Sequence, residues 1–308
     1  NLLLIIAFLE GGIVMCIELL GARFLAPVYG SSLEVWSIVL ALSVGALTLG
    51  YFAGGFFSQK SNKSFLLQLL LLGAGIFILL MPVLAKLVIS DFNPDNLILD
   101  CLVATLIFIA PPLFLLGSTT PIIIELKSET INDSGKTAGL VYGISTIGGI
   151  FFTYFTGFYL IPNHGLTTTT IIAATTISLL SFLLLLKEKR WIALSIVPIF
   201  ILSIFNSNDL KSLSPDVKVI HYSEGMLGQL LLLDLETKYN EFTTKERAIF
   251  VNRIGQTWVN AETGDSRWDY PNFLVSIAST LKPNPNVLVL GLGGGTVPRY
   301  FESILNAK

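Results

Sequence analysis

Long apolar segments recur through the first two thirds of the chain, and they constrain its fold more than any other feature. Each approaches the ~20 residues that an α-helix needs to cross the hydrocarbon layer of a membrane. Of all residues, 53% are hydrophobic and only 13% are charged. An ordinary soluble protein does not have this composition, so we predict a multi-span α-helical membrane domain over residues 1–208.

We expect about seven transmembrane helices in this domain. The fourth should be kinked or broken, because Pro111, Pro112 and Pro121 fall within it. The seventh is the shortest and contains Pro198. The boundary with a more polar part is expected between Asn206 and Pro215. The expected spans are residues 2–26, 32–57, 64–89, 97–124, 137–161, 165–186 and 191–207.

The charged residues between spans predict an orientation in the bacterial inner (plasma) membrane. Basic residues follow the second, fourth and sixth spans, whereas Asp91 and Asp95 follow the third. The positive-inside rule therefore places the even-numbered ends in the cytoplasm. A seventh crossing would put the polar part outside, away from cytosolic cofactors, whereas a segment 191–207 that lies in the interface would keep it inside. The side of the C-terminal domain stays open.

Three charged residues lie in the first apolar segment: Glu10, Glu18 and Arg23. The two carboxylates fall on nearly the same helical face, and a charge within a membrane is costly. One interpretation is a membrane polar site, either a path for a cation or proton or a polyamine site. The other is that Glu18 pairs with Arg23 or with hydroxyl groups of another span and only fixes packing.

Glycines at helical spacing, such as Gly50 and Gly54, predict close packing between helices. The stretch GYFAGGFFSQKSNK, residues 50–63, also resembles the loop signature of major-facilitator transporters, without its usual acidic residue. Cys16 and Cys101 lie in apolar segments, and His164 is far from His221, so we expect no metal site. The net charge of -2 and the lack of a basic patch argue against a nucleic-acid partner.

The remaining sequence predicts two small domains. Three β-rich runs between residues 217 and 260 indicate a small antiparallel β-strand domain, residues 209–262. A helix is expected over residues 268–281. The following stretch, VLVLGLGGGTVPRYF at residues 287–301, reads as strand, glycine turn and helix, which is the start of a Rossmann-like, methyltransferase-type nucleotide-binding domain at residues 263–308.

The order of these motifs resembles the spermidine synthase family of polyamine aminopropyltransferases. ELLGARFLAPVYGSSLEVW, residues 18–36, is similar to the branch in which a multi-span membrane domain is fused ahead of the synthase. The resemblance implies that Gln256 contacts the donor and Tyr270 lines the polyamine groove. It also implies that the cofactor loop contains Gly291, Gly293 and Gly295. The donor would be decarboxylated S-adenosylmethionine, the acceptor a polyamine, and no metal would be needed.

The chain also departs from the family pattern. Gly294 stands where the family loop carries an Asp, and Pro271 stands where a His or Gln follows the tyrosine. The catalytic residues are expected beyond Lys308, so the chain reads as a fragment. We expect a membrane enzyme that transfers an aminopropyl group. The alternatives are a transporter or membrane-complex subunit with a non-catalytic synthase-like domain, or a methyltransferase. A homodimer is common in the family.

Overall fold

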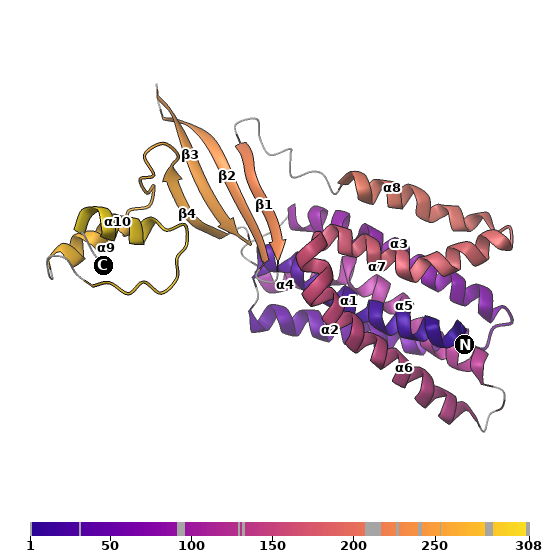
Figure 1. Ribbon diagram of the computed structural model, residues 1–308. Coiled ribbons are helices and arrows are strands. Elements are labelled where there is room, and N and C mark those ends of the chain that lie inside the picture. The colour runs from indigo at the N-terminus through magenta and orange to yellow at the C-terminus, as the bar shows by residue number, and fades with distance from the viewer. Residues whose placement is uncertain are drawn as a thin grey trace. The chain divides into compact units, whose positions relative to one another are not determined.

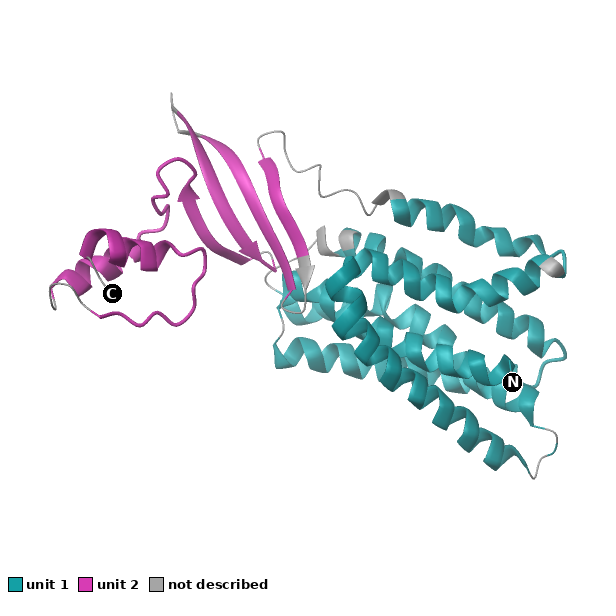
Figure 2. Cartoon of the chain, in the orientation of Figure 1, with its two compact units in different colours: residues 1–209, 224–226 teal, residues 210–223, 227–308 magenta. Residues whose placement is uncertain are grey.

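The computed structural model falls into two compact units, which we describe separately (Figure 2). Unit 1 comprises residues 1–209 and 224–226, and unit 2 comprises residues 210–223 and 227–308. The expected domain boundary falls almost wholly on residues 207–216, which lie outside the described residues. The structure describes residues 2–30, 32–90, 96–128, 130, 133–206, 217–225, 228–239, 242–252, 254–280 and 286–305.

From its first described residue to Asn206, unit 1 consists of helices joined by short connections (Figure 1). Its segments are rich in Leu, Ile and Ala, and helices suit a membrane because every backbone polar group is bonded within the segment. The helices are α1 (Leu2–Tyr29), α2 (Leu33–Phe57), α3 (Lys63–Ser90), α4 (Leu97–Phe108), α5 (Ala110–Lys127), α6 (Ser134–Phe155), η3 (Thr156–Leu160), α7 (Ile161–Lys187), η4 (Trp191–Ser195) and α8 (Ile196–Asn206).

Among the described residues, four helices are long and apolar enough to cross a membrane, or five if α4 and α5 count as one bent span. This fits a multi-pass membrane protein, with fewer such helices than the seven expected. The break predicted in the fourth span is confirmed. The chain bends by 48° between α4 and α5, where Pro111 and Pro112 occupy the first turn of α5.

The structure has fewer membrane-spanning helices than the seven expected because of the last three expected spans. The fifth and sixth lie within one helical run, Ser134–Leu186, of 53 residues. A π-helical turn, η3, and the non-helical backbone of Gly165 (φ 74°, ψ 176°) interrupt this run. The seventh expected span forms only the short apolar helix Trp191–Ile204. At ~1.5 Å per residue that helix is about 20 Å long, which is less than the ~30 Å of a hydrocarbon layer.

Glycines allow the helices of unit 1 to approach closely, as expected for Gly50 and Gly54. Helix α1 packs on α6, α2 on α5, and α3 on α7. A Cβ atom on Gly54 would collide with the carbonyl oxygen of Ser118 in α5, whereas one on the adjacent Gly55 would meet no atom within 4 Å. On α6, Gly148 lies in the same way against the backbone of Phe8. These contacts hold the α1–α6 and α2–α5 pairs together.

Unit 2 contains the expected antiparallel sheet. Its strands are β1 (Val217–Gly225), β2 (Gly228–Tyr239), β3 (Phe242–Val251) and β4 (Ile254–Asn260), in the order β1-β2-β3-β4. Strands β2 and β3 pair antiparallel, as do β3 and β4. The third β-rich run therefore contains two strands, and Asn252, with a φ of 51°, follows the first of them at the chain reversal.

Two helices follow the sheet: α9 (Tyr270–Ser279) and α10 (Thr296–Leu305). The expected strand at residues 287–290 is not formed. Its residues Leu288 and Leu290 are 84% and 87% exposed. A β-strand needs a neighbouring strand for its backbone hydrogen bonds, and no described strand pairs with this segment. The described part of unit 2 thus forms no Rossmann-like domain, although the glycine turn and the helix after it are present.

Candidate functional site

Glu10 is a buried carboxylate in the interior of unit 1. It is 2% exposed and lies about 12 Å along α1 at ~1.5 Å per residue. Two hydroxyl groups donate hydrogen bonds to it: Thr120 of α5 to Oε1 at 3.3 Å, and Ser145 of α6 to Oε2 at 3.1 Å. Residues 110 and 135 positions away in the sequence thus converge on one carboxylate.

Helices α1 and α6 come close enough for the Ser145 bond because Gly11 has no side chain. A Cβ atom at Gly11 would collide with the carbonyl oxygen and the Oγ atom of Ser145. Tyr51 of α2 lies within electrostatic reach of both Glu10 and Glu18. Its ring makes an edge-on contact with Tyr142 of α6, with centroids 6.4 Å apart. The surroundings of Glu10 therefore consist of hydroxyl groups and helix backbone.

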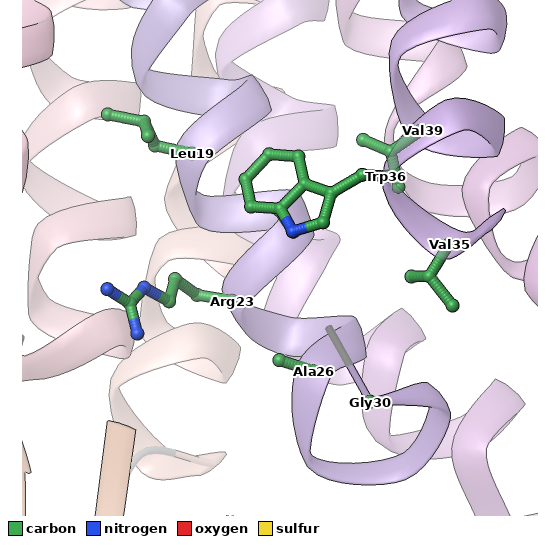
Figure 3. Close-up of a pocket in the computed structure, with 8 residues that line it drawn as sticks. Leu19, Arg23, Ala26, Gly30, Val35, Trp36 and Val39 are labelled. Carbon is green, nitrogen blue, oxygen red and sulfur yellow. The ribbon is translucent and has the colours of Figure 1, made fainter. Parts of the chain in front are cut away.

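Glu18 and Arg23 do not join this group. Glu18 is half-buried, and within the described part of the chain it makes no ion pair with Arg23. Arg23 instead lines a cavity of about 270 Å³ between α1 and α2 (Figure 3). The three charged residues expected to act as one membrane polar site are therefore divided, and Glu10 is the one enclosed by polar partners from other helices.

Figure 3 shows the two walls of the cavity, with Leu19, Arg23 and Ala26 on one and Val35, Trp36 and Val39 on the other. Its lining is apolar apart from the Arg23 guanidinium, the Trp36 indole and backbone groups. Arg23 is the one charged residue among those that line this cavity.

In unit 2, the glycine turn has a backbone that requires glycine. Gly291, Gly293 and Gly295 have φ angles of 97°, 53° and 79°, in the region where a Cβ atom causes steric strain. Helix α10 begins directly afterwards, at Thr296. The turn therefore leads directly into a helix N-terminus, an arrangement that is suited to an anionic or ribose-bearing ligand. The backbone N–H groups of Gly294 and Gly295 are themselves used within the chain, because they donate to Thr257 Oγ1 and to the Leu292 carbonyl oxygen.

The turn is tied to the end of β4 beside Gln256. The backbone N–H of Gly294 donates to Thr257 Oγ1 at 2.7 Å, and that hydroxyl donates to the carbonyl oxygen of Gln256 at 2.7 Å. A Cβ atom on Gly294 would lie 2.6 Å from Thr257 Oγ1. An Asp side chain would therefore not fit at position 294 while Thr257 stays in place.

Tyr270 is linked to the first residues of β4 through Trp268. It begins α9, is 48% exposed, and its ring centroid is 6.0 Å from that of Trp268. The Trp268 ring covers Gly255, the residue before Gln256. Pro271 is buried in the first turn of α9. The structure thus gathers the glycine turn, Gln256 and Tyr270 at one end of the sheet in unit 2.

Helix α10 is anchored to the segment that follows β4. The hydroxyl of Tyr300 accepts a hydrogen bond from the backbone N–H of Ser266 at 2.7 Å. Arg299 donates to the carbonyl oxygen of Thr263 at 2.7 Å. These bonds fix the helix that begins at the turn, and therefore the direction in which its N-terminus points.

The sequence did not lead us to Glu246, the buried carboxylate of the sheet. It is 1% exposed, pairs with Arg267 Nε at 2.8 Å and accepts from Trp258 Nε1 at 2.7 Å. Thr237 adds a third bond at 3.1 Å. An acidic residue inside a β-rich run was the available signal, but its partners come from three other segments.

No group of three or more His, Cys, Asp or Glu residues in the described ranges is arranged to hold a metal ion. No protein-family model matches the sequence, and searches of curated proteins and of solved structures give no significant match. The geometry of the two sites therefore carries the functional argument.

Proposed function

We propose that unit 2 binds decarboxylated S-adenosylmethionine and transfers its aminopropyl group to a polyamine or a related amine. The observation that carries this proposal is the glycine turn with three positive φ angles, hydrogen-bonded to β4 beside Gln256. Tyr270 at the same end of the sheet and the resemblance of the motif order to spermidine synthases add support.

The chemistry is a displacement at carbon. The amine nitrogen attacks the aminopropyl carbon next to the sulfonium, the C–N bond forms, and the C–S bond breaks to release a neutral thioether. The attacking nitrogen must lose a proton to a base. In this proposal the turn and Gln256 hold the nucleotide, and alignment of donor and amine lowers the barrier.

Titration calorimetry of the full chain in lipid nanodiscs tests the nucleotide site, with the donor and with the thioether product as ligands. Gly293→Val should abolish binding, because a β-branched side chain strains a backbone with a φ of 53° and should change the turn. Leu292→Ala is the control, because Leu292 is 71% exposed and should bind normally. Failure to bind either ligand, with no donor consumed in the presence of any diamine, would refute the proposal.

A second candidate is transport of a cationic amine by unit 1, with a non-catalytic synthase-like domain. The buried Glu10, bonded by hydroxyl groups from two other helices, favours it. Uptake of labelled polyamine into proteoliposomes should be lost in Glu10→Gln and retained in Gly293→Val. Equal uptake by the native chain and Glu10→Gln would exclude this role for Glu10.

A further inference from the structure

Glu10 has no described cationic partner, and this is unusual for a carboxylate that is 2% exposed. Its two hydrogen bonds come from the neutral hydroxyl groups of Thr120 and Ser145. No Lys, Arg or His residue in the described ranges forms an ion pair with it. The positive charge that would balance an ionised Glu10 is therefore not supplied by the described part of the protein.

An ionised carboxylate at this position would be strongly unfavourable. Removal from water disfavours the charged form, and lipid on the far side of the helices lowers the local dielectric further. Two hydroxyl hydrogen bonds replace only part of the lost hydration. An ionised Glu10 would therefore need one positive charge that the described residues do not supply.

We propose that the Glu10 site binds one monovalent cation, either a proton or Na⁺. The available ligands are all oxygen atoms: the Glu10 carboxylate, Thr120 Oγ1 and Ser145 Oγ. A single carboxylate balances a single positive charge. A divalent ion such as Ca²⁺ requires about six to eight oxygen ligands and more negative charge.

The described ionisable groups on α1 and on the helices packed against it form no ion pair with Glu10. Tyr51 of α2 and Glu18 of α1 are acids, and Tyr142 of α6 contacts Tyr51. On α5, Glu125 forms its ion pair with Lys63 of α3 at 2.6 Å. The other described cations lie several turns away along their helices: Arg23 on α1, Lys127 at the end of α5 and Lys136 at the start of α6. Asp100 and Cys101 lie on α4, and His164 lies in the first turn of α7.

Infrared difference spectroscopy on the full chain in nanodiscs tests the proposal at neutral pH. The probe is the acid C=O band of a protonated carboxyl, assigned to Glu10 by its loss in Glu10→Gln. If the bound cation is a proton, the band is present in N-methylglucamine buffer and does not change when Na⁺ is added. If it is Na⁺, the band is present without Na⁺ and disappears when Na⁺ is added. An ionised Glu10 in the sodium-free buffer, with no acid band, would overturn the proposal.

Two neighbouring threonines provide a matched control. Thr120→Val removes a hydrogen bond to Glu10 and should shift the band. Thr119→Val removes a buried hydroxyl that donates to the Leu116 carbonyl oxygen instead, and should leave the band in place. Equal shifts in both variants would count against a site built on Thr120.

The inference is independent of the nucleotide site of unit 2 and deepens the second candidate function. The two can fail separately, because the infrared band reports a bound cation even in a chain that takes up no polyamine. Conversely, the chain could take up polyamine and yet show no acid C=O band of Glu10 in sodium-free buffer. That result would support the transport function and reject the cation site at Glu10.

Discussion

Each unit of the chain buries one glutamate in its described residues, and the two glutamates have different partners. Glu246 in the sheet is 1% exposed and has an ion pair with Arg267 as well as hydrogen bonds from Trp258 and Thr237. Glu10 in the helical unit is 2% exposed and has only two hydroxyl partners. The first carboxylate is neutralised within the fold, whereas the second requires a charge from outside.

This difference separates a structural carboxylate from a functional one. A buried charge whose partner comes from the same fold contributes to a single arrangement of strands and loops. A buried carboxylate without such a partner changes its energy with the ions in the medium. The comparison therefore predicts that similar substitutions at the two glutamates have different effects.

The largest effect is expected for Glu246→Gln. This change leaves the Arg267 guanidinium without its carboxylate and should lower the stability of the sheet by about 3 kcal/mol. Amide hydrogen exchange of β3 and β4 in the full chain should become about 100-fold faster, since ~1.4 kcal/mol corresponds to tenfold. Glu236→Gln, at an exposed position of β2, is the control and should change little. If amide hydrogen exchange were unchanged in Glu246→Gln, the ion pair with Arg267 would not stabilise the sheet, and Glu246 could not be called a structural carboxylate.

An effect of about 2 kcal/mol is expected for Gly54→Ala, because overpacking at a close helix contact costs about 1–3 kcal/mol. The new methyl group would meet the backbone of Ser118. Gly55→Ala adds a methyl group in open space and should keep the native stability. Thermal unfolding of both variants in the same detergent measures the difference. A similar midpoint for both would show that α2 and α5 pack less closely than described.

Glu10→Gln should change the stability of unit 1 by less than about 1 kcal/mol. Gln is neutral and has nearly the same shape. Its amide oxygen can accept from one of the two hydroxyl groups, and its NH2 group can donate to the oxygen of the other. Unfolding should be followed in sodium-free N-methylglucamine buffer, so that loss of a bound ion does not contribute. A loss as large as that of Glu246→Gln would mean that Glu10 is ionised and paired, and the comparison would fail.

The smallest effect concerns pH and the exposed pair on the sheet. Arg247 donates two hydrogen bonds to Asp234, and these lower the pKa of the Asp234 carboxyl below its ordinary value. The pair should therefore stabilise the sheet above the ordinary Asp pKa of about 4 and lose that contribution as the pH falls through the lowered value. The loss should be about 0.2–1 kcal/mol. Hydrogen exchange against pH should show it in the native chain and not in Asp234→Asn.

Local features were predictable from the sequence because their causes are local. The adjacent prolines Pro111 and Pro112 predicted the break between α4 and α5. The spacing of Gly50 and Gly54 predicted a close contact, and both glycines lie against α5. Three β-rich runs between residues 217 and 260 predicted the antiparallel sheet.

Features that depend on distant residues were not predictable. Nothing near Glu10 indicates that its partners are Thr120 and Ser145, because helix packing alone brings these residues together. The apolar run at residues 287–290 has strand propensity, but a strand also needs a neighbouring strand, and the described residues supply none. The apolar segment after residue 190 was predicted to cross the membrane because of its hydropathy. Its helix, Trp191–Ile204, is shorter than the ~20 residues that a membrane crossing needs.

Both cysteines of the chain are buried: Cys16 is 1% exposed and Cys101 is 0% exposed. Cys16 also accepts a hydrogen bond from Thr156 in the π-helical turn, at 3.4 Å. A water-soluble thiol reagent that does not cross lipid should therefore leave the native protein almost unlabelled. A single thiol placed in the exposed turn after β4, by Glu262→Cys, would be the one accessible reporter in an otherwise silent chain. Its labelling in intact cells or only after lysis would reveal on which side of the membrane the sheet lies.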